Sequence, residues 1–137
     1  MKATIAVVSL LAALGPAMAQ SSKQEPTKPV AVMQQVVTGM PKGEQQEIRI
    51  FTATFAPGQA TVHHTHRFPV TVYILEGTFT LEMEGKPPVA VKAGESIVEP
   101  PNIPVTGYNR SNTEPIKLVI FYVSDPDTPF LDVIAHK

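Results

Sequence analysis

Residues 58–77 have the sequence GQATVHHTHRFPVTVYILEG, and this stretch is the most informative part of the chain. Apolar and polar side chains alternate in two runs, 60–66 and 70–75, with the period of two that is typical of β-strands. The dipeptide Glu76-Gly77 then predicts a tight hairpin turn into a following strand. The stretch therefore indicates an all-β domain.

The same pattern continues on both sides of this stretch. Residues 47–55, EIRIFTATF, alternate throughout and end at a Pro57-Gly58 turn. No later segment has the period of 3.6 that marks an amphipathic helix. Short strands with frequent turns predict a β-sandwich or β-barrel. The further predicted strands are 78–84, 89–91, 96–99, 105–109 and 116–123.

The composition excludes several classes of function. The chain has 137 residues, of which 11 are Lys or Arg and 12 are Asp or Glu. Such a balance lacks the basic surface that neutralises phosphates, so we expect no nucleic-acid partner. There is no cysteine, which excludes disulfides, thiolate metal sites and a cysteine nucleophile.

The first 19 residues have the pattern of a secretory signal peptide. A basic Lys2 precedes an apolar run at 3–14, and Ala17-Met18-Ala19 is a cleavage motif. The run is too short to span a membrane, so we expect the mature chain, from Gln20, to be periplasmic or secreted without membrane insertion. Residues 20–29 are polar and read as a flexible tether. The single domain is then 30–137, with its core at about 47–123.

Three of the four histidines occur together in this chain, as Val62-His63-His64-Thr65-His66. Alternate side chains of a strand share a face, so His64 and His66 point the same way and His63 points the other. Two imidazoles on one face are able to bind a transition metal through nitrogen. The alternative is a polar pair at a strand end with no ligand.

The histidine pair lies in a stretch that resembles the first motif of the cupin superfamily, G-x5-H-x-H-x3-E-x6-G. Gly58, His64, His66 and Gly77 stand at the motif positions without a gap. Val70 stands where the motif has glutamate.

A second stretch resembles the second cupin motif, G-x5-P-x-G-x2-H-x3-N. Gly94, Pro100 and Asn109 match its spacing. Asn102 stands at the glycine position and Val105 at the histidine position.

The resemblance covers about residues 30–123 and implies a small jelly-roll β-barrel, the double-stranded β-helix. It is most similar to short single-domain bacterial cupins of the quercetin-dioxygenase-like kind. In that family the metal is typically held by the two histidines, the glutamate and the second-motif histidine. Only His64 and His66 carry over, which implies a partial site. A divalent transition metal (Fe, Mn, Ni, Cu or Zn) is expected to bind there weakly or not at all.

Glu99 is a weaker candidate for a third ligand. Strict alternation through Val105 would point it into the barrel, although Pro100-Pro101 make that parity unreliable. Charged side chains are seldom buried without a partner, so we expect Glu99 to face solvent or cap a turn, with the inward orientation as the alternative.

Four further residues are expected in the barrel interior as candidates for binding a small molecule. Val70 and Val105 make the former ligand positions apolar. Tyr73 and Tyr122 lie on predicted strands and offer a phenol to a ligand or, more ordinarily, to the packing of the wall.

Besides a structural role in which the barrel serves for dimerisation, two functions of different classes follow from this reading. The first is a small-molecule binding protein with a partial metal site, favoured by Val70 and Val105. The second is a metal-dependent cupin enzyme, similar to a dioxygenase, isomerase or lyase, in which His64 and His66 act with an improvised ligand. The sequence assigns no catalytic residue. We also expect a homodimer, with the apolar segment 30–37 exchanged between copies.

Overall fold

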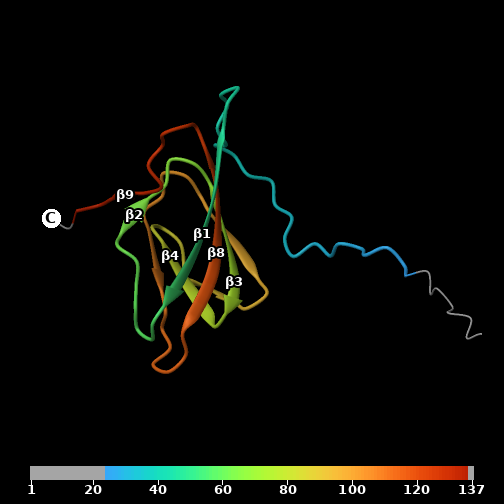
Figure 1. Ribbon diagram of the computed structural model, residues 1–137. Helices are drawn as coiled ribbons and strands as arrows, with labels where there is room; N and C mark the ends of the chain where they lie inside the picture. Colours follow the sequence, from blue (N-terminus) through green and yellow to red (C-terminus); the bar gives the residue numbers. More distant parts are fainter. Residues whose placement is uncertain (1–23, 136–137) are drawn as a thin grey trace, which may run out of the picture.

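The computed structural model describes residues 24–135, which form a barrel of short strands with no helix among them (Figure 1). No segment of this part of the chain is a helix long and apolar enough to cross a membrane. The strands are β1 (Glu47–Phe55), β2 (His64–Thr65), β3 (Val70–Glu76), β4 (Thr78–Met83), β5 (Val89–Lys92), β6 (Ser96–Glu99), β7 (Val105–Tyr108), β8 (Ile116–Ser124) and β9 (Asp132–Val133).

The strands form two antiparallel sheets that pack against each other. The first sheet has the order β1-β8-β3-β6 and the second the order β5-β4-β7-β2-β9. Among the pairings of these two sheets, only that of β4 with β5 joins consecutive strands, and the others join more distant segments, such as β1 with β8. This arrangement confirms the predicted all-β, jelly-roll barrel.

Alternation along the strands places one face of each sheet in the core. On β3, for example, Val70, Val72 and Ile74 are buried while Thr71 and Tyr73 are half-buried on the outer face. Leu81 of β4 and Leu118 of β8 reach the same core from the two sheets. The remaining buried apolar side chains are Phe55, Phe79, Val91, Val105, Ile116 and Tyr122.

The turn that leads from β3 in the first sheet to β4 in the second depends on Gly77. Its φ is +80°, and a Cβ at this position would lie 2.5 Å from the carbonyl oxygen of Pro115. Any other residue would be both strained and in collision with backbone. The predicted turn at Glu76-Gly77 is therefore present, but the predicted hairpin is wrong, because β3 and β4 belong to different sheets and do not pair.

The strands observed differ from those predicted in two places. The run 60–66 contains only the short β2, because Ala60 makes an isolated bridge to Tyr108 and residues 61–63 are irregular. The two-residue β9 was not predicted, since two residues are too few to show a period. Residues 24–46, which include most of the expected tether and the segment 30–37, contain no strand. The predicted signal peptide lies outside the described residues.

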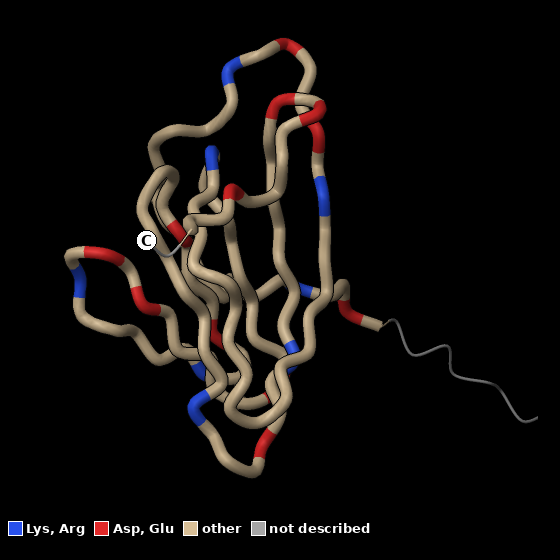
Figure 2. Tube along the Cα trace, turned by 90° about the vertical axis from the view of Figure 1, so that its left-hand side faces the viewer, with Lys and Arg blue, Asp and Glu red and all other residues tan. Residues whose placement is uncertain are grey.

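Charged residues lie mostly in the turns and near the strand ends. In the view of Figure 2 both signs are interspersed along the loops, and the strands are largely uncharged. Several of these residues form exposed ion pairs, including Arg67 with Asp132 and Arg110 with Glu82. Exposed pairs of this kind typically contribute less than about 1 kcal/mol each to stability.

Candidate metal centre

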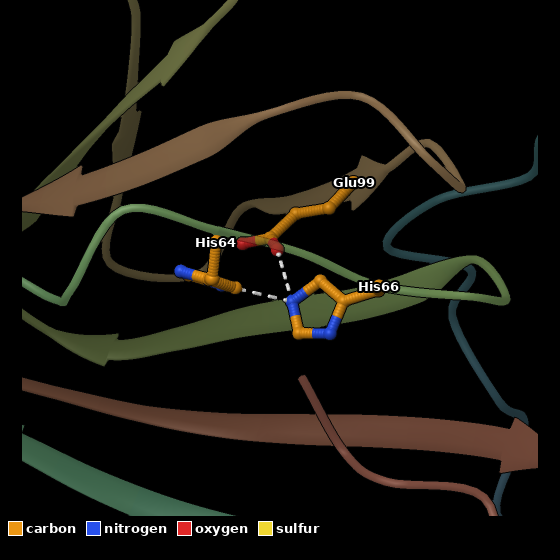
Figure 3. Close-up of side chains that lie close together, drawn as sticks. All are labelled: His64, His66 and Glu99. Carbon is orange, nitrogen blue, oxygen red and sulfur yellow. Dashed lines mark hydrogen bonds and ion pairs between the residues drawn. The ribbon is translucent and has the colours of Figure 1, made fainter. Parts of the chain in front are cut away.

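The two predicted ligands, His64 on β2 and His66 just after it, both point into the barrel. Their exposed fractions are 5% and 2%. The two rings are nearly perpendicular, and their Nε2 atoms are 3.0 Å apart (Figure 3). His63 points to the other face, where its Nδ1 lies 3.0 Å from the hydroxyl of Thr106. The alternation predicted for the three histidines is therefore observed.

Hydrogen bonds to carbonyl groups determine which ring nitrogens carry protons. Nδ1 of His64 donates to the carbonyl oxygen of Val62 at 2.7 Å, and Nδ1 of His66 donates to that of Phe130 at 2.6 Å. A carbonyl oxygen only accepts, so each Nδ1 is protonated. In the neutral rings both Nε2 atoms, which are 3.0 Å apart, then carry lone pairs.

A carboxylate completes the cluster. Glu99, the last residue of β6, is 5% exposed, and its Oε2 lies 3.0 Å from Nε2 of His66. The expectation that Glu99 faces solvent or caps a turn is wrong. Parity within β6 turns it inward, and Pro100-Pro101 follow the strand without interrupting it. Burial is tolerated because the carboxylate has an imidazole partner.

The three donors fit a divalent transition metal. All their ligand atoms lie within 4.8 Å of one another. Two ligands at 90° on a metal, with bonds of about 2.1 Å, are about 3.0 Å apart. The two measured contacts have this length. Two nitrogen lone pairs and a carboxylate oxygen so close together also repel one another unless a cation or a proton lies between them. Two histidines and one carboxylate form the donor set of non-haem iron(II) sites with open positions.

Burial also favours the neutral form of His64. The pKa of His64 lies below its ordinary value of 6.5, chiefly because desolvation disfavours the charged ring. The nearby His66 acts in the same direction, while the hydrogen bond to Val62 and the charge of Glu99 oppose the shift. The neutral ring is the form that binds metals.

A small cavity of about 70 Å³ lies beside the cluster. A water molecule has a share of about 30 Å³ in the liquid, so the cavity accommodates only a very small ligand. Apart from the three cluster residues and Thr61, its walls are apolar or glycine. They are formed by Phe55, Val70, Val72, Phe79, Gly107, Leu118, Ile120, Phe130 and Leu131.

The four residues predicted for the interior have different places. Val70 is buried and lines the cavity. Val105 and Tyr122 are buried in the core close to the histidines, but neither lines the cavity. The prediction for Tyr73 is wrong, because Tyr73 is three positions from Val70 on β3 and alternation turns it to the outer face.

Two contributions to the centre were not predicted from the sequence. The carbonyl group of Phe130 orients His66 from a position 64 residues away, for which a single sequence carries no signal. Asn102, at the glycine position of the second motif, has a φ of 58°, which asparagine tolerates. Its N–H donates to the carbonyl oxygen of His66 at 2.7 Å and so links the two motifs.

Solved structures with the same fold support the architecture. A conserved Klebsiella pneumoniae protein with a double-stranded β-helix domain has a TM-score of 0.56 and 18% identity, over 74% of this chain and 90% of that chain. A cupin-like protein from Thermotoga maritima has a TM-score of 0.55 and 20% identity, over 64% and 65%. A DMSP lyase from Ruegeria pomeroyi has a TM-score of 0.55 and 21% identity, over 63% of this chain but only 42% of the lyase.

The sequence itself identifies the family. A search of curated proteins gave no match. The family model for the cupin domain matches residues 51–122, which is more than half of the chain and includes every cluster residue. The chain therefore belongs to the cupin domain family.

Proposed function

We propose that this cupin is a metal-binding protein whose centre consists of His64, His66 and Glu99, and that the metal acts on a small molecule in the adjoining cavity. One observation carries the proposal: two nitrogen lone pairs and a buried carboxylate converge at separations of 3.0 Å. Three protein ligands leave coordination positions open for a small ligand.

The chain's own residues have defined tasks in this function. Val62 and Phe130 hold the imidazole protons on the two Nδ1 atoms through their carbonyl groups. Glu99 supplies the negative charge that offsets that of a divalent ion. The apolar wall excludes water and so strengthens electrostatic interactions inside the cavity. When bound, the metal supplies a Lewis acid, or dioxygen chemistry in the case of iron(II).

The reaction is proposed only at the level of metal-assisted chemistry on a small molecule. Among the proteins of similar fold are a DMSP lyase and, at 16% identity, a polyketide cyclase from Streptomyces resistomycificus. Such distant likeness supports the fold and does not transfer a reaction, because one fold hosts many activities.

A second candidate is a protein that binds a small apolar molecule without a metal. The observation that favours it is the apolar wall, with Val70 and Val105 at two positions where the family has ligands. In this case Glu99 and His66 form a buried ion pair that fixes the positions of two residues of the cavity wall.

Metal content separates the two candidates. The mature chain is stripped with a chelator, incubated separately with iron(II), manganese, nickel, copper and zinc, dialysed and analysed by elemental mass spectrometry. We expect about one metal per chain for at least one ion, and loss of that metal in Glu99→Gln and in the His64→Gln, His66→Gln double variant. Glu84→Gln, which changes an exposed carboxylate on β4's turn, is the matched control. Absence of all five metals would favour the metal-free candidate.

We also propose that the chain is exported, on the basis of the Ala17-Met18-Ala19 motif. Mass spectrometry of the protein recovered from the periplasm or medium should find an N-terminus near Gln20. A chain that still begins at Met1 would contradict the proposal.

A further inference from the structure

The segment between β8 and β9, residues 125–131, loops over one end of the barrel (Figure 1), and its Phe130 contacts His66 of the metal cluster. We call this segment the strap. It has the sequence DPDTPFL and contains no helix or strand. Its one internal backbone hydrogen bond runs from Thr128 N–H to the carbonyl oxygen of Asp125 at 3.3 Å. The strap is therefore held in place mainly by contacts with the rest of the barrel.

Phe130 is the part of the strap that reaches the centre. Its ring lies 4.8 Å from the ring of His66, 5.4 Å from that of Tyr122 and 4.7 Å from that of Phe51. The ring and the neighbouring Leu131 form part of the cavity wall. The carbonyl group of the same residue accepts the Nδ1 proton of His66. One residue thus closes the cavity and orients a metal ligand.

Two arginines hold the strap, one at its middle and one directly after its last residue. Nη2 of Arg49 donates to the carbonyl oxygen of Thr128 at 2.7 Å and to the hydroxyl of Ser124 at 3.0 Å. Arg67 forms a bidentate pair with Asp132, at 2.9 and 3.1 Å. The pair between Arg67 and Asp132 is exposed, so it stabilises the position of the strap only weakly, and its residues can be substituted.

The two histidine ligands differ in what orients them. His64 donates to Val62, two residues away, so its orientation is local. His66 donates to the strap and depends on its position. Displacement of the strap would leave the Nδ1 proton of His66 without its acceptor and would allow the other tautomer, in which Nε2 carries the proton and cannot bind a metal.

We propose that Phe130 is a positioning residue for the metal centre and that the strap covers this centre, so that closure of the strap and binding of the metal strengthen each other. The inference rests on the proposed function. Reciprocity follows from linkage: if a closed strap favours metal binding, the bound metal must favour the closed strap by the same free energy.

The test compares variants that loosen the strap with a matched control. Arg67→Ala removes the pair with Asp132, whereas Arg110→Ala removes a similarly exposed pair with Glu82 of β4, which does not involve the strap. Phe130→Gly removes the ring and loosens the backbone, and Phe130→Leu keeps an apolar side chain. Metal affinity is measured by competition with a chelating dye at one pH. Hydrogen exchange of the strap amides is measured with and without metal, and the ¹⁵N resonances of His66 report its tautomer.

We expect Phe130→Gly to weaken metal binding by about fivefold or more, the lower end of ordinary coupling, and Arg67→Ala to weaken it by less, while Phe130→Leu and Arg110→Ala stay near wild type. In the wild type the metal should slow exchange of the strap amides. In Phe130→Gly the ¹⁵N spectrum should show a mixture of His66 tautomers, an effect that a general loss of stability would not produce.

Two results would overturn the inference, and they are distinguishable. If the wild type binds metal and all four variants bind it equally well, the coupling is absent while the proposed function stands. If the wild type itself binds no metal, the proposed function fails and the inference fails with it.

Discussion

Val70 and Glu99 lie directly opposite each other in the antiparallel pair of β3 and β6. Val70 stands where the first cupin motif has its glutamate, so the carboxylate of this chain comes from the neighbouring strand. Opposite residues of an antiparallel pair share a face, with Cβ atoms about 4.5–5.5 Å apart. The side chain of Glu99 therefore reaches the space in front of His66 from the adjacent position.

This relationship predicts that the carboxylate can be transferred from position 99 to position 70, where the cupin motif has its glutamate. The Val70→Glu, Glu99→Val double variant should bind metal with an affinity within about tenfold of the wild type, because one carboxylate still faces the histidines. Val70→Glu alone should lower the melting temperature of the metal-free protein, since two carboxylates then face each other in a buried site. Melting temperatures with and without manganese provide the measurement. A double variant whose melting temperature does not change with manganese would show that position 70 does not reach the histidine pair.

Asn109, at the last position of the second motif, is predicted to be structural. It is 2% exposed, and its Nδ2 lies within hydrogen-bonding distance of the carbonyl oxygens of Phe55, Ala56 and Glu114 at 3.2, 3.1 and 2.8 Å. Asn109→Ala removes the donor to the buried carbonyl group of Phe55 and to those of Ala56 and Glu114, at about 1–3 kcal/mol for a group that water cannot reach. We expect urea denaturation to show a loss of at least about 2 kcal/mol.

The control for this prediction is Asn112→Ala, because Asn112 is exposed in the same loop. Its effect should stay within about 0.5 kcal/mol. Equal stabilities of the two variants would mean that the Asn109 network contributes little to the fold.

The lowered pKa of His64 predicts a pH dependence of stability for the metal-free protein. In the unfolded chain His64 titrates near 6.5, whereas in the folded chain burial makes protonation harder. The unfolded state therefore binds more protons below pH 6.5, and stability falls as the pH decreases through that value. His66, Glu99 and His63 are the charged or titratable groups that act on His64.

Thermal unfolding between pH 7.5 and 5.5 in the presence of a chelator tests this dependence. The midpoint should decrease on acidification, and His64→Gln should make the decrease smaller. A wild type and a variant with parallel pH profiles would show that His64 does not contribute.

The outer face of the first sheet predicts association of two chains. Ile48 and Ile50 of β1 are 73% and 60% exposed, and Phe121, opposite Ile50 on β8, is 42% exposed. The segment 30–37 adds Val30 and Val36, exposed by 87% and 96%. We propose that two copies cover these apolar surfaces mutually, because monomers seldom expose contiguous apolar patches.

Light scattering should therefore find a dimer for the wild type and a monomer for the Ile50→Asp, Phe121→Asp double variant. Val62→Asp places the same charge at an exposed apolar position beside β2 and should leave the dimer intact. A monomeric wild type at high micromolar concentration would contradict the proposal.

The sequence by itself determined most of the strands and two of the three residues of the metal centre. Strands such as β1 and β6 have the predicted bounds, since alternation is a local property that reflects which face is buried. The same alternation put His64 and His66 on one face, because residues i and i+2 of an extended chain necessarily share it.

Only the tertiary structure decided that Glu99 and Phe130 join these two histidines. Whether Glu99 meets His66 depends on how β6 of one sheet packs against β2 of the other, and whether Phe130 meets His66 depends on the path of the strap. These contacts join residues 33 and 64 positions apart, and neither periodicity nor propensity specifies a partner at such separations. The burial of a charged side chain could not be predicted either, because it becomes favourable only once the imidazole that compensates it lies within reach.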